Sequence, residues 1–177
     1  MVRQVSRKEK SVLDIGSLSL SSAALVVSLL SFYFSIKSWR ETNRPIVTAR
    51  VSSFDGGNMG TALNILVENS GNRPAIDVRL SINPDHLKSA LREDVDPVWS
   101  KSLNRIFSER GSIAVLGNGR SVSNDFGFLS GDSQSTWKGD LRLTVEISYQ
   151  DLDGRKFRHS IPLLIADDKG FAGGFWG

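Results

Sequence analysis

The sequence DLRLTVEISY, residues 140–149, contains the clearest structural signal in the chain. Apolar residues occupy every odd position from 141 to 149, and charged or polar residues occupy the positions between them. Because successive side chains of a strand point to opposite faces, this period of two predicts a strand with one buried and one solvated face. The turn sequence Asp151–Arg155 follows, and residues 156–163 predict a partner strand. Pro162 places that partner at a sheet edge or at a bulge.

The same alternation recurs upstream. Short apolar segments with turn sequences between most of them lie at 47–51, 63–67, 76–82, 113–115 and 122–128. About seven short strands with this spacing are typical of an antiparallel sandwich of two sheets. The fold class is therefore predicted as mainly β, an Ig-like antiparallel β-sandwich.

One segment, residues 84–110, departs from the β pattern. Its apolar residues suit one or two short helices broken at Pro97, with Asp85 as the N-cap and Gly111 as the stop. We interpret it as a helical insertion that covers one end of the sandwich. The alternative is a functional lid or docking surface, on which Lys101, Arg105 and Arg110 share one face.

The stretch LVENSGNRPAIDVRL, residues 66–80, carries a family resemblance. It resembles the second and third strands of bacterial immunoglobulin-like domains of the CARDB-like kind, in which a V-x-N-x-G turn precedes A-x-x-V. Residues 149–154 and Phe157 look like the final hairpin of such domains. The resemblance implies a sandwich with a binding or spacer role, and it transfers no catalytic residues. The helical insertion departs from that pattern.

The N-terminal part holds a long uncharged run from Ile15 to Ile36. As a helix, this run spans about 33 Å and crosses a hydrocarbon core of about 30 Å. The helix should end before Arg44-Pro45, since proline disfavours helix in the preceding residue. We predict a single membrane-spanning helix. A cleaved signal peptide, a buried helix of a soluble protein and an amphipathic helix on a membrane surface stay open at this point.

Small residues form a stripe along this helix. Their spacing alternates between four and three residues, so they fall within an arc of about 100°. The stripe consists of Ser17, Ser21, Ala24, Ser28, Ser31, Ser35 and Ser38. Small residues let membrane helices approach closely, and a 3.5-residue period implies a left-handed supercoil. We predict a seam for homo-oligomers. Chance spacing is one alternative, and the lining of a water-filled pore is another.

Flanking residues bear on membrane topology. Tyr33, Trp39 and Arg40 are predicted at the membrane interface, where aromatic and basic side chains concentrate. Four Lys or Arg residues precede the run and four follow it within 14 residues, so the positive-inside rule nearly ties. The short, net-positive N-terminal tail favours export of the C-terminal part. The prediction is a single-pass protein of the cell membrane with an extracytoplasmic sandwich, and a cytoplasmic sandwich stays open.

Composition narrows the function classes. The chain has 22 Lys+Arg and 19 Asp+Glu residues, but residues 45–177 hold 15 basic and 16 acidic ones. That part lacks the basic stripe that nucleic-acid binding needs. The chain contains no Cys, which excludes disulfides, thiolate metal sites and a Cys nucleophile. His86 and His159 have no catalytic motif beside them, and Asp151 and Asp153 suit a hairpin turn better than a calcium loop. We expect no enzyme activity, no metal and no cofactor.

The C-terminal sequence FAGGFWG concentrates aromatic residues among glycines. Phe171, Phe175 and Trp176 either pack back onto the sandwich or contact a partner. The predicted organisation is a basic tail (1–12), a membrane helix with its extension (13–44), a sandwich (45–167) and a Gly/aromatic tail (168–177). The expected function is a membrane-anchored module that self-associates and binds an unknown protein or small ligand. The alternative is an oligomerising effector that forms a pore or disrupts the membrane, with the sandwich as sensor or assembly domain.

Overall fold

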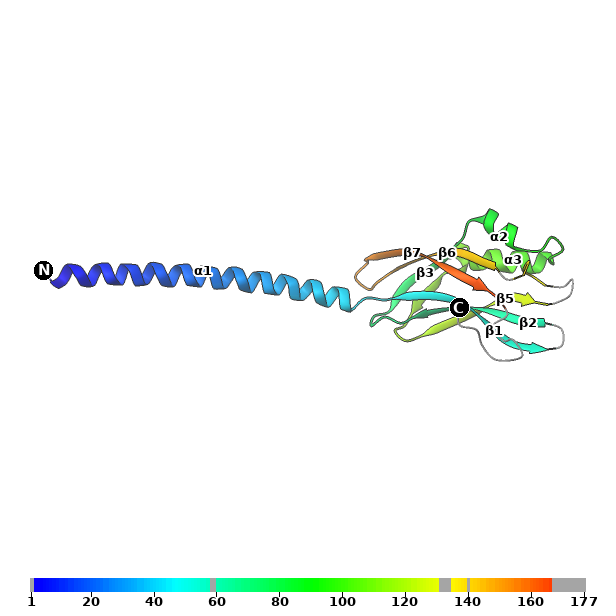
Figure 1. The fold of residues 1–177 in the computed structure, drawn as a ribbon, viewed down its shortest axis with the longest axis horizontal. Helices are drawn as coiled ribbons and strands as arrows, with labels where there is room; N and C mark the ends of the chain where they lie inside the picture. The colour runs from blue at the N-terminus through cyan, green and yellow to red at the C-terminus, as the bar shows by residue number, and fades with distance from the viewer. Residues whose placement is uncertain (1, 58–59, 131–134, 140, 167–177) are drawn as a thin grey trace. The chain divides into compact units, whose positions relative to one another are not determined.

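The computed structural model describes residues 2–57, 60–130, 135–139 and 141–166. The chain divides into two compact units, residues 1–43 and residues 44–177, which we call the β domain. The first unit is built on one helix, and the second contains all of the strands (Figure 1). The tail residues Phe171, Phe175 and Trp176 lie outside the described residues.

Helix α1 runs without interruption from Val2 to Thr42. It begins well before residue 13, where the membrane helix was predicted to start, because the preceding sequence contains helix-forming Arg, Lys, Glu and Gln and no Gly or Pro. It ends before Arg44-Pro45, as predicted. The backbone N–H and the side-chain amide of Asn43 both donate to the carbonyl of Trp39, at 2.9 Å each, and so satisfy a terminal carbonyl.

Two antiparallel sheets form the β domain, which confirms the predicted fold class. The three-stranded sheet has the order β1-β2-β5, and the four-stranded sheet has the order β4-β3-β6-β7 (Figure 1). The strands are β1 (Val47–Gly57), β2 (Gly60–Asn69), β3 (Ala75–Ser81), β4 (Ile113–Leu116), β5 (Ser121–Leu129), β6 (Leu141–Gln150) and β7 (Lys156–Ile165). In an Ig constant domain the fourth strand joins the sheet of the first two. Here the fourth strand, β4, pairs with β3 instead.

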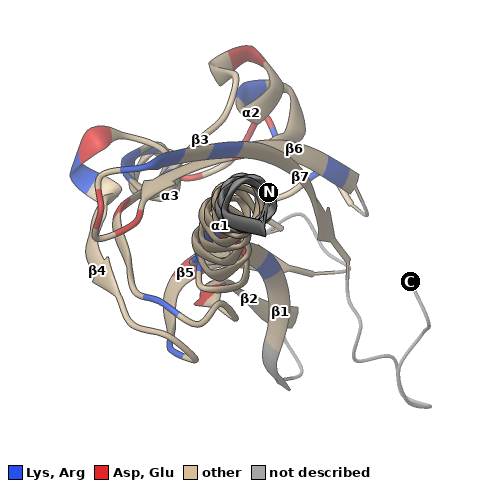
Figure 2. Cartoon of the chain, turned by 90° about the vertical axis from the view of Figure 1, so that its left-hand side faces the viewer, with Lys and Arg blue, Asp and Glu red and all other residues tan. Residues whose placement is uncertain are grey.

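Strand β6 bears out the alternation seen in the sequence. Leu143, Val145, Ile147 and Tyr149 are buried, while the residues between them are exposed or half-buried. Strand β7 pairs with β6 in continuous register and lies at a sheet edge, which agrees with Pro162 as an edge residue. Basic and acidic residues are interspersed along the backbone of the β domain (Figure 2).

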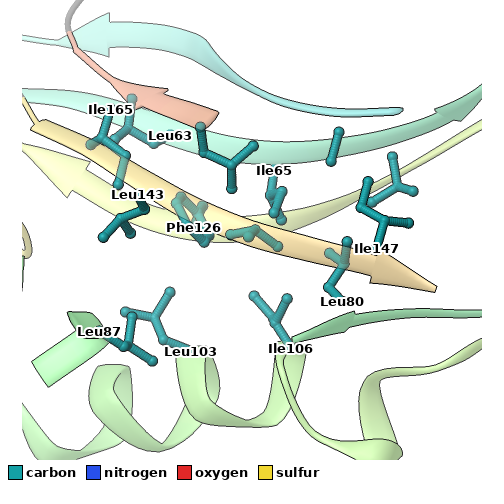
Figure 3. Packing of buried hydrophobic residues seen from close by; sticks show 14 of the residues in the cluster. Leu63, Ile65, Leu80, Leu87, Leu103, Ile106, Phe126, Leu143, Ile147 and Ile165 are labelled. Carbon is teal, nitrogen blue, oxygen red and sulfur yellow. The ribbon is translucent and has the colours of Figure 1, made fainter. Parts of the chain in front are cut away.

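The core lies between the sheets. Leu63 and Ile65 of β2 meet Leu143 and Ile147 of β6, with Phe126 of β5 among them (Figure 3). Trp137 is fully buried, and its ring packs against that of Phe126 with the centroids 4.8 Å apart and the planes tilted by 33°. Its indole N–H donates to the Phe126 carbonyl at 2.8 Å. A buried tryptophan that satisfies its polar atom contributes both packing and orientation.

The insertion forms two helices and one 3₁₀ turn: α2 (Pro84–Ala90), α3 (Pro97–Ile106) and η1 (Glu109–Gly111). Leu87, Leu103 and Ile106 point from these helices into the core (Figure 3). The predicted cap at Asp85 was wrong, because Asn83 accepts from the Asp85 backbone N–H and Pro84 occupies the first helical position. Pro97 begins α3 behind the cap Asp96.

Candidate membrane anchor and interaction surfaces

Helix α1 leaves its apolar side chains uncovered. Residues Leu20–Thr42 form a segment that is long and apolar enough to cross a membrane, and none of it is buried. Leu25, Leu29 and Phe32 expose 62%, 61% and 65% of their surface. A core helix of a soluble protein buries such residues, so that interpretation fails for α1. The length and composition of this segment suit an apolar environment such as a membrane.

The small-residue stripe lies along this helix. Ser21, Ala24, Ser28, Ser31, Ser35 and Ser38 are all exposed. The side chain of Ser17, the first member of the predicted stripe, lies outside the described residues. The hydroxyl of Ser28 donates to the Ala24 carbonyl at 2.8 Å, so its proton is satisfied within the helix while its oxygen can still accept. Such a surface suits close contact with another helix.

The predicted interface residues lie near the C-terminal end of α1. Tyr33 and Trp39 expose 62% and 56% of their surface, and Arg40 occupies the last turn. The rings of Tyr33 and Phe34 meet edge to face at 5.7 Å. A cation in the last turn interacts favourably with the negative end of the helix dipole, in addition to any contact with lipid head groups.

Asn69 connects the turns at the end of the β domain that holds Pro45. Its side-chain oxygen accepts from the backbone N–H of Ile46 at 3.1 Å and of Gly71 at 3.0 Å. Its amide nitrogen donates to the carbonyls of Arg73 at 2.7 Å and Leu116 at 3.1 Å. Asn69 is 1% exposed. Its buried hydrogen bonds hold together Ile46 just before β1, the turn at residues 71–73 and the end of β4 at Leu116.

Gly71 in the same motif permits a close approach. A Cβ atom at this position would collide with the backbone of Arg44, Pro45 and Ile46. The residues that carried the CARDB-like resemblance, Asn69 and Gly71, therefore have a structural role in this chain. A second link at this end is the ion pair of Arg73 with Asp153, which raises the pKa of Arg73 through a side-chain hydrogen bond. Asp151 accepts from the backbone of Asp153 and Arg155 and shapes the hairpin turn.

One side of the sandwich is closed, where β1 and β7 meet. The Nε2 atom of His159 lies 3.0 Å from the carbonyl of Val47, and the hydroxyl of Tyr149 donates to the carbonyl of Pro45 at 3.3 Å. The ring of Tyr149 also stacks on Phe157 at 5.1 Å. His159 of β7 therefore contacts β1 of the other sheet. His86 lies on the short helix α2.

The other side, between β4 and β5, is open, and we call it the open edge. Val122 of β5 pairs with Val67, which points inward, yet Val122 is 42% exposed. A cavity of about 150 Å³ lies below this opening. The cavity is lined mainly by apolar side chains from both sheets and from α3. They are Ile65, Val67, Leu80, Ile106, Ile113 and Val122.

A basic hollow borders the open edge on the side of α3. It is lined by Lys101, Asn104, Arg105, Ser108, Glu109 and Arg110. Arg105 and Arg110 directly adjoin Ile106 and Gly111, which line the apolar cavity. Glu109 lies 3.6 Å from the guanidinium of Arg79. Within the described ranges, no ion pair joins Lys101, Arg105 or Arg110 to a carboxylate.

Sequence reasoning found the exposed helix and the basic face of α3, but it missed the open edge. The available signal was Val122, an apolar residue within the polar stretch SVSND. That signal alone does not show that β4 and β5 belong to different sheets. Among the described residues, no group of three or more His, Asp or Glu side chains is placed to hold a metal ion.

The sequence was compared with models of known protein families and with curated proteins. Residues 12–167 match a family described as a domain of unknown function (DUF8453). The chain belongs to the DUF8453 family. The DUF8453 match starts inside α1 and ends just after β7, so it includes the membrane-length segment together with both sheets. No curated protein matches the chain.

Proposed function

We propose that this chain is a membrane-anchored assembly and binding module that self-associates through the small-residue stripe of α1. The observation that carries the proposal is the exposure of the whole Leu20–Thr42 segment, with the stripe residues on one side of it. Lipid gives apolar helices no hydrophobic reason to associate, so close backbone approach and hydroxyl contacts are the available forces. The stripe supplies both. The proposed role is non-catalytic.

The β domain would supply the binding part of this module. Its similarity in sequence pattern to CARDB-like Ig domains supports a binding or spacer role. The loops of β-sandwiches, and their exposed strand edges, are the usual recognition surfaces. The ligand is proposed to be a protein or a small molecule, and nucleic acid is not expected.

Self-association is tested with the full chain in mild detergent. The triple variant Ser21→Leu, Ser28→Leu and Ser35→Leu adds bulk along the stripe while keeping the helix apolar. Its oligomer mass, measured by light scattering, should fall to that of a monomer. The matched control Leu25→Ile, Leu29→Ile and Phe32→Leu changes exposed residues outside the stripe and should keep the native mass. An unchanged mass in the triple Ser variant contradicts the proposal.

A second candidate is a pore. Polar residues in membrane helices usually face a bundle interior or a water-filled cavity, and five of the exposed stripe residues are serines. Only the pore hypothesis predicts potassium efflux from cells that overproduce the chain. This efflux should disappear in the triple Leu variant. Native oligomers without any efflux support the assembly module instead.

Orientation is proposed with the β domain outside the cytoplasm. The chain lacks Cys, so single Cys variants report their position cleanly. Thr144 is exposed on the outer face of β6, and Ser6 lies before the membrane-length segment. A membrane-impermeant thiol reagent applied to intact cells should label Thr144→Cys and spare Ser6→Cys. Labelling of Ser6→Cys alone reverses the proposed orientation.

A further inference from the structure

At the open edge, strand β5 has a strand partner on one side only, among the residues that the structure describes. Strand β5 is the last in the order β1-β2-β5, and residues Ser121–Asp125 are exposed. The remainder of β5 is covered, because the Thr136 backbone N–H donates to the Phe128 carbonyl at 2.9 Å. This stretch of five residues is about the length of a typical strand, and it offers outward backbone N–H and C=O groups at alternate residues. The exception is the Asp125 N–H, which donates to the Asn124 side-chain oxygen at 2.9 Å. Such an edge accepts an additional strand from a partner.

The volume of the cavity beneath this edge limits the size of the side chain that a bound strand can insert into it. An apolar cavity of about 150 Å³ accepts one benzene-sized group. The cavity at the open edge has a volume of about 150 Å³, and its walls include Ile65, Leu80 and Ile113. A strand added to β5 would direct alternate side chains into the space between the sheets. One aromatic side chain of such a strand would fill it.

The basic side chains of the hollow favour a partner segment with acidic residues. Lys101, Arg105 and Arg110 surround it, and its carboxylate Glu109 already contacts Arg79. Because Arg105 and Arg110 adjoin residues of the cavity wall, an acidic group near the aromatic anchor would face these cations. The combined surface fits an extended acidic segment with an aromatic residue a few positions away.

The chain itself carries such a segment. Asp167 and Asp168 precede Phe171, and in an extended strand three residues span about 10 Å. We propose that residues 167–172 of a second copy add to the free edge of β5. Phe171 of that copy enters the cavity, and its Asp167 and Asp168 face Lys101, Arg105 and Arg110. This inference rests on the proposed self-association and names a second contact between the copies.

Geometry favours a second copy over the same chain. Strand β7 ends at Ile165, and three strand spacings, about 14 Å, separate β7 from β4. Ile165 also pairs with Leu141, while Leu80 of the cavity pairs with Ile147, six residues further along β6. Asp168 lies three residues beyond Ile165 and reaches about 10 Å. The offset of six residues along β6 is about 20 Å, so the cavity wall at Leu80 of the same chain lies beyond the reach of Asp168. A neighbouring copy has no such restriction.

Disulfide trapping between full-length copies tests this arrangement in membranes. One tagged copy carries Asn124→Cys at the rim of the cavity, and a second copy with another tag carries Ala172→Cys next to the anchor. Oxidation should produce a disulfide between the two copies. The control pair, Thr144→Cys with Ala172→Cys, should give none, because Thr144 lies on the outer face of the other sheet. Equal yields in both pairs, or none in either, overturn the inference.

Variants of the tail test the anchor. In the Ala172→Cys copy, Phe171→Ser should lower the disulfide yield at least about tenfold, the loss expected when a buried Phe is removed. Phe175→Ser is the matched control and should keep the yield within about threefold. Asp168→Arg should also lower the yield, and Arg105→Asp in the other copy should restore it. A yield that depends on Phe175 and not on Phe171 contradicts the assignment of the anchor.

Two further measurements separate the possible failures. A single copy that carries both Asn124→Cys and Ala172→Cys should not close an internal disulfide, and efficient internal closure shows that the tail occupies its own cavity. The trapping pair is also repeated with the Ser21, Ser28 and Ser35 to Leu changes. If the interchain disulfide persists and the triple Leu variant keeps the native oligomer mass in detergent, the contact proposed here stands and the α1 seam fails. If the seam holds and no disulfide forms, the tail contact alone fails.

Discussion

The two units of this chain treat apolar residues in opposite ways. In the β domain, alternate residues of β2 and β6 are buried between the sheets, and Leu63, Ile65 and Ile147 expose 1% or less of their surface. In α1, Leu25 and Phe32 expose more than 60%. The β domain thus buries its own core, while α1 contains a segment that is long and apolar enough to cross a membrane. The proposed division of roles, with anchoring and assembly in α1 and recognition in the β domain, rests on this difference.

The largest effect should come from charges placed in α1. Leu25→Arg together with Leu29→Arg should remove the chain from the membrane, because each Arg near the centre of a membrane helix costs about 2.5–3.5 kcal/mol. The measurement is the fraction that stays in the membrane pellet after alkaline carbonate extraction. Leu25→Val with Leu29→Val is the control and should remain in the pellet. A double Arg variant that also remains in the pellet would contradict the proposal that α1 spans the membrane.

The second effect tests the core of the β domain. Trp137→Ala should lower the free energy of unfolding by about 3–5 kcal/mol, because it removes a fully buried aromatic ring and a hydrogen bond. Urea unfolding of the full chain in detergent, followed by circular dichroism, measures this change. Val98→Ala is the control, since Val98 is 73% exposed and should change stability by about 0.5 kcal/mol or less. Equal effects from both variants would show that the described core is wrong.

A somewhat smaller loss in the free energy of unfolding is expected from a change at Asn69, at the end of the β domain that holds Pro45. Asn69→Leu should cost about 3 kcal/mol, because several backbone groups lose their partner and each unsatisfied buried group costs about 1–3 kcal/mol. Ser70→Ala is the neighbouring control, because Ser70 is exposed and makes a long hydroxyl contact of 3.4 Å to Ile46. The same urea measurement distinguishes the two. If Asn69→Leu behaves like Ser70→Ala, the network does not hold the turns together.

The smallest effect concerns a surface ion pair. A hydrogen bond from Arg158 is the main cause that holds the pKa of Glu146 below its usual 4.5. The folded state therefore gains stability above the unfolded-state pKa and loses it as the pH falls through the lowered folded-state pKa. Glu146→Gln should be slightly less stable at pH 7 and should lose less stability on acidification. Unfolding curves at pH 7 and pH 3 check this, and identical pH dependence in both proteins contradicts it.

These elements differ in how far the sequence reveals them. Strand β6 was predictable because the period of two in residues 141–149 directly reflects one buried and one exposed face. The apolar stretch of α1 was predictable from the uncharged run between Ile15 and Ile36. However, the partners of β4 and β5 depend on packing between distant segments, with β4 beside β3 and β5 beside β2. The open edge and its cavity follow from that partition and were not predictable.

The α1 seam is most directly tested by a Cys scan along the helix. Single Cys variants at each position from 20 to 39 are oxidised in membranes, and the yield of disulfide-linked dimers is measured. The account predicts a period of 3.5 residues with maxima at positions 21, 24, 28, 31, 35 and 38. Uniform yields, or maxima at Leu25, Leu29 and Phe32, would contradict a seam built from small residues.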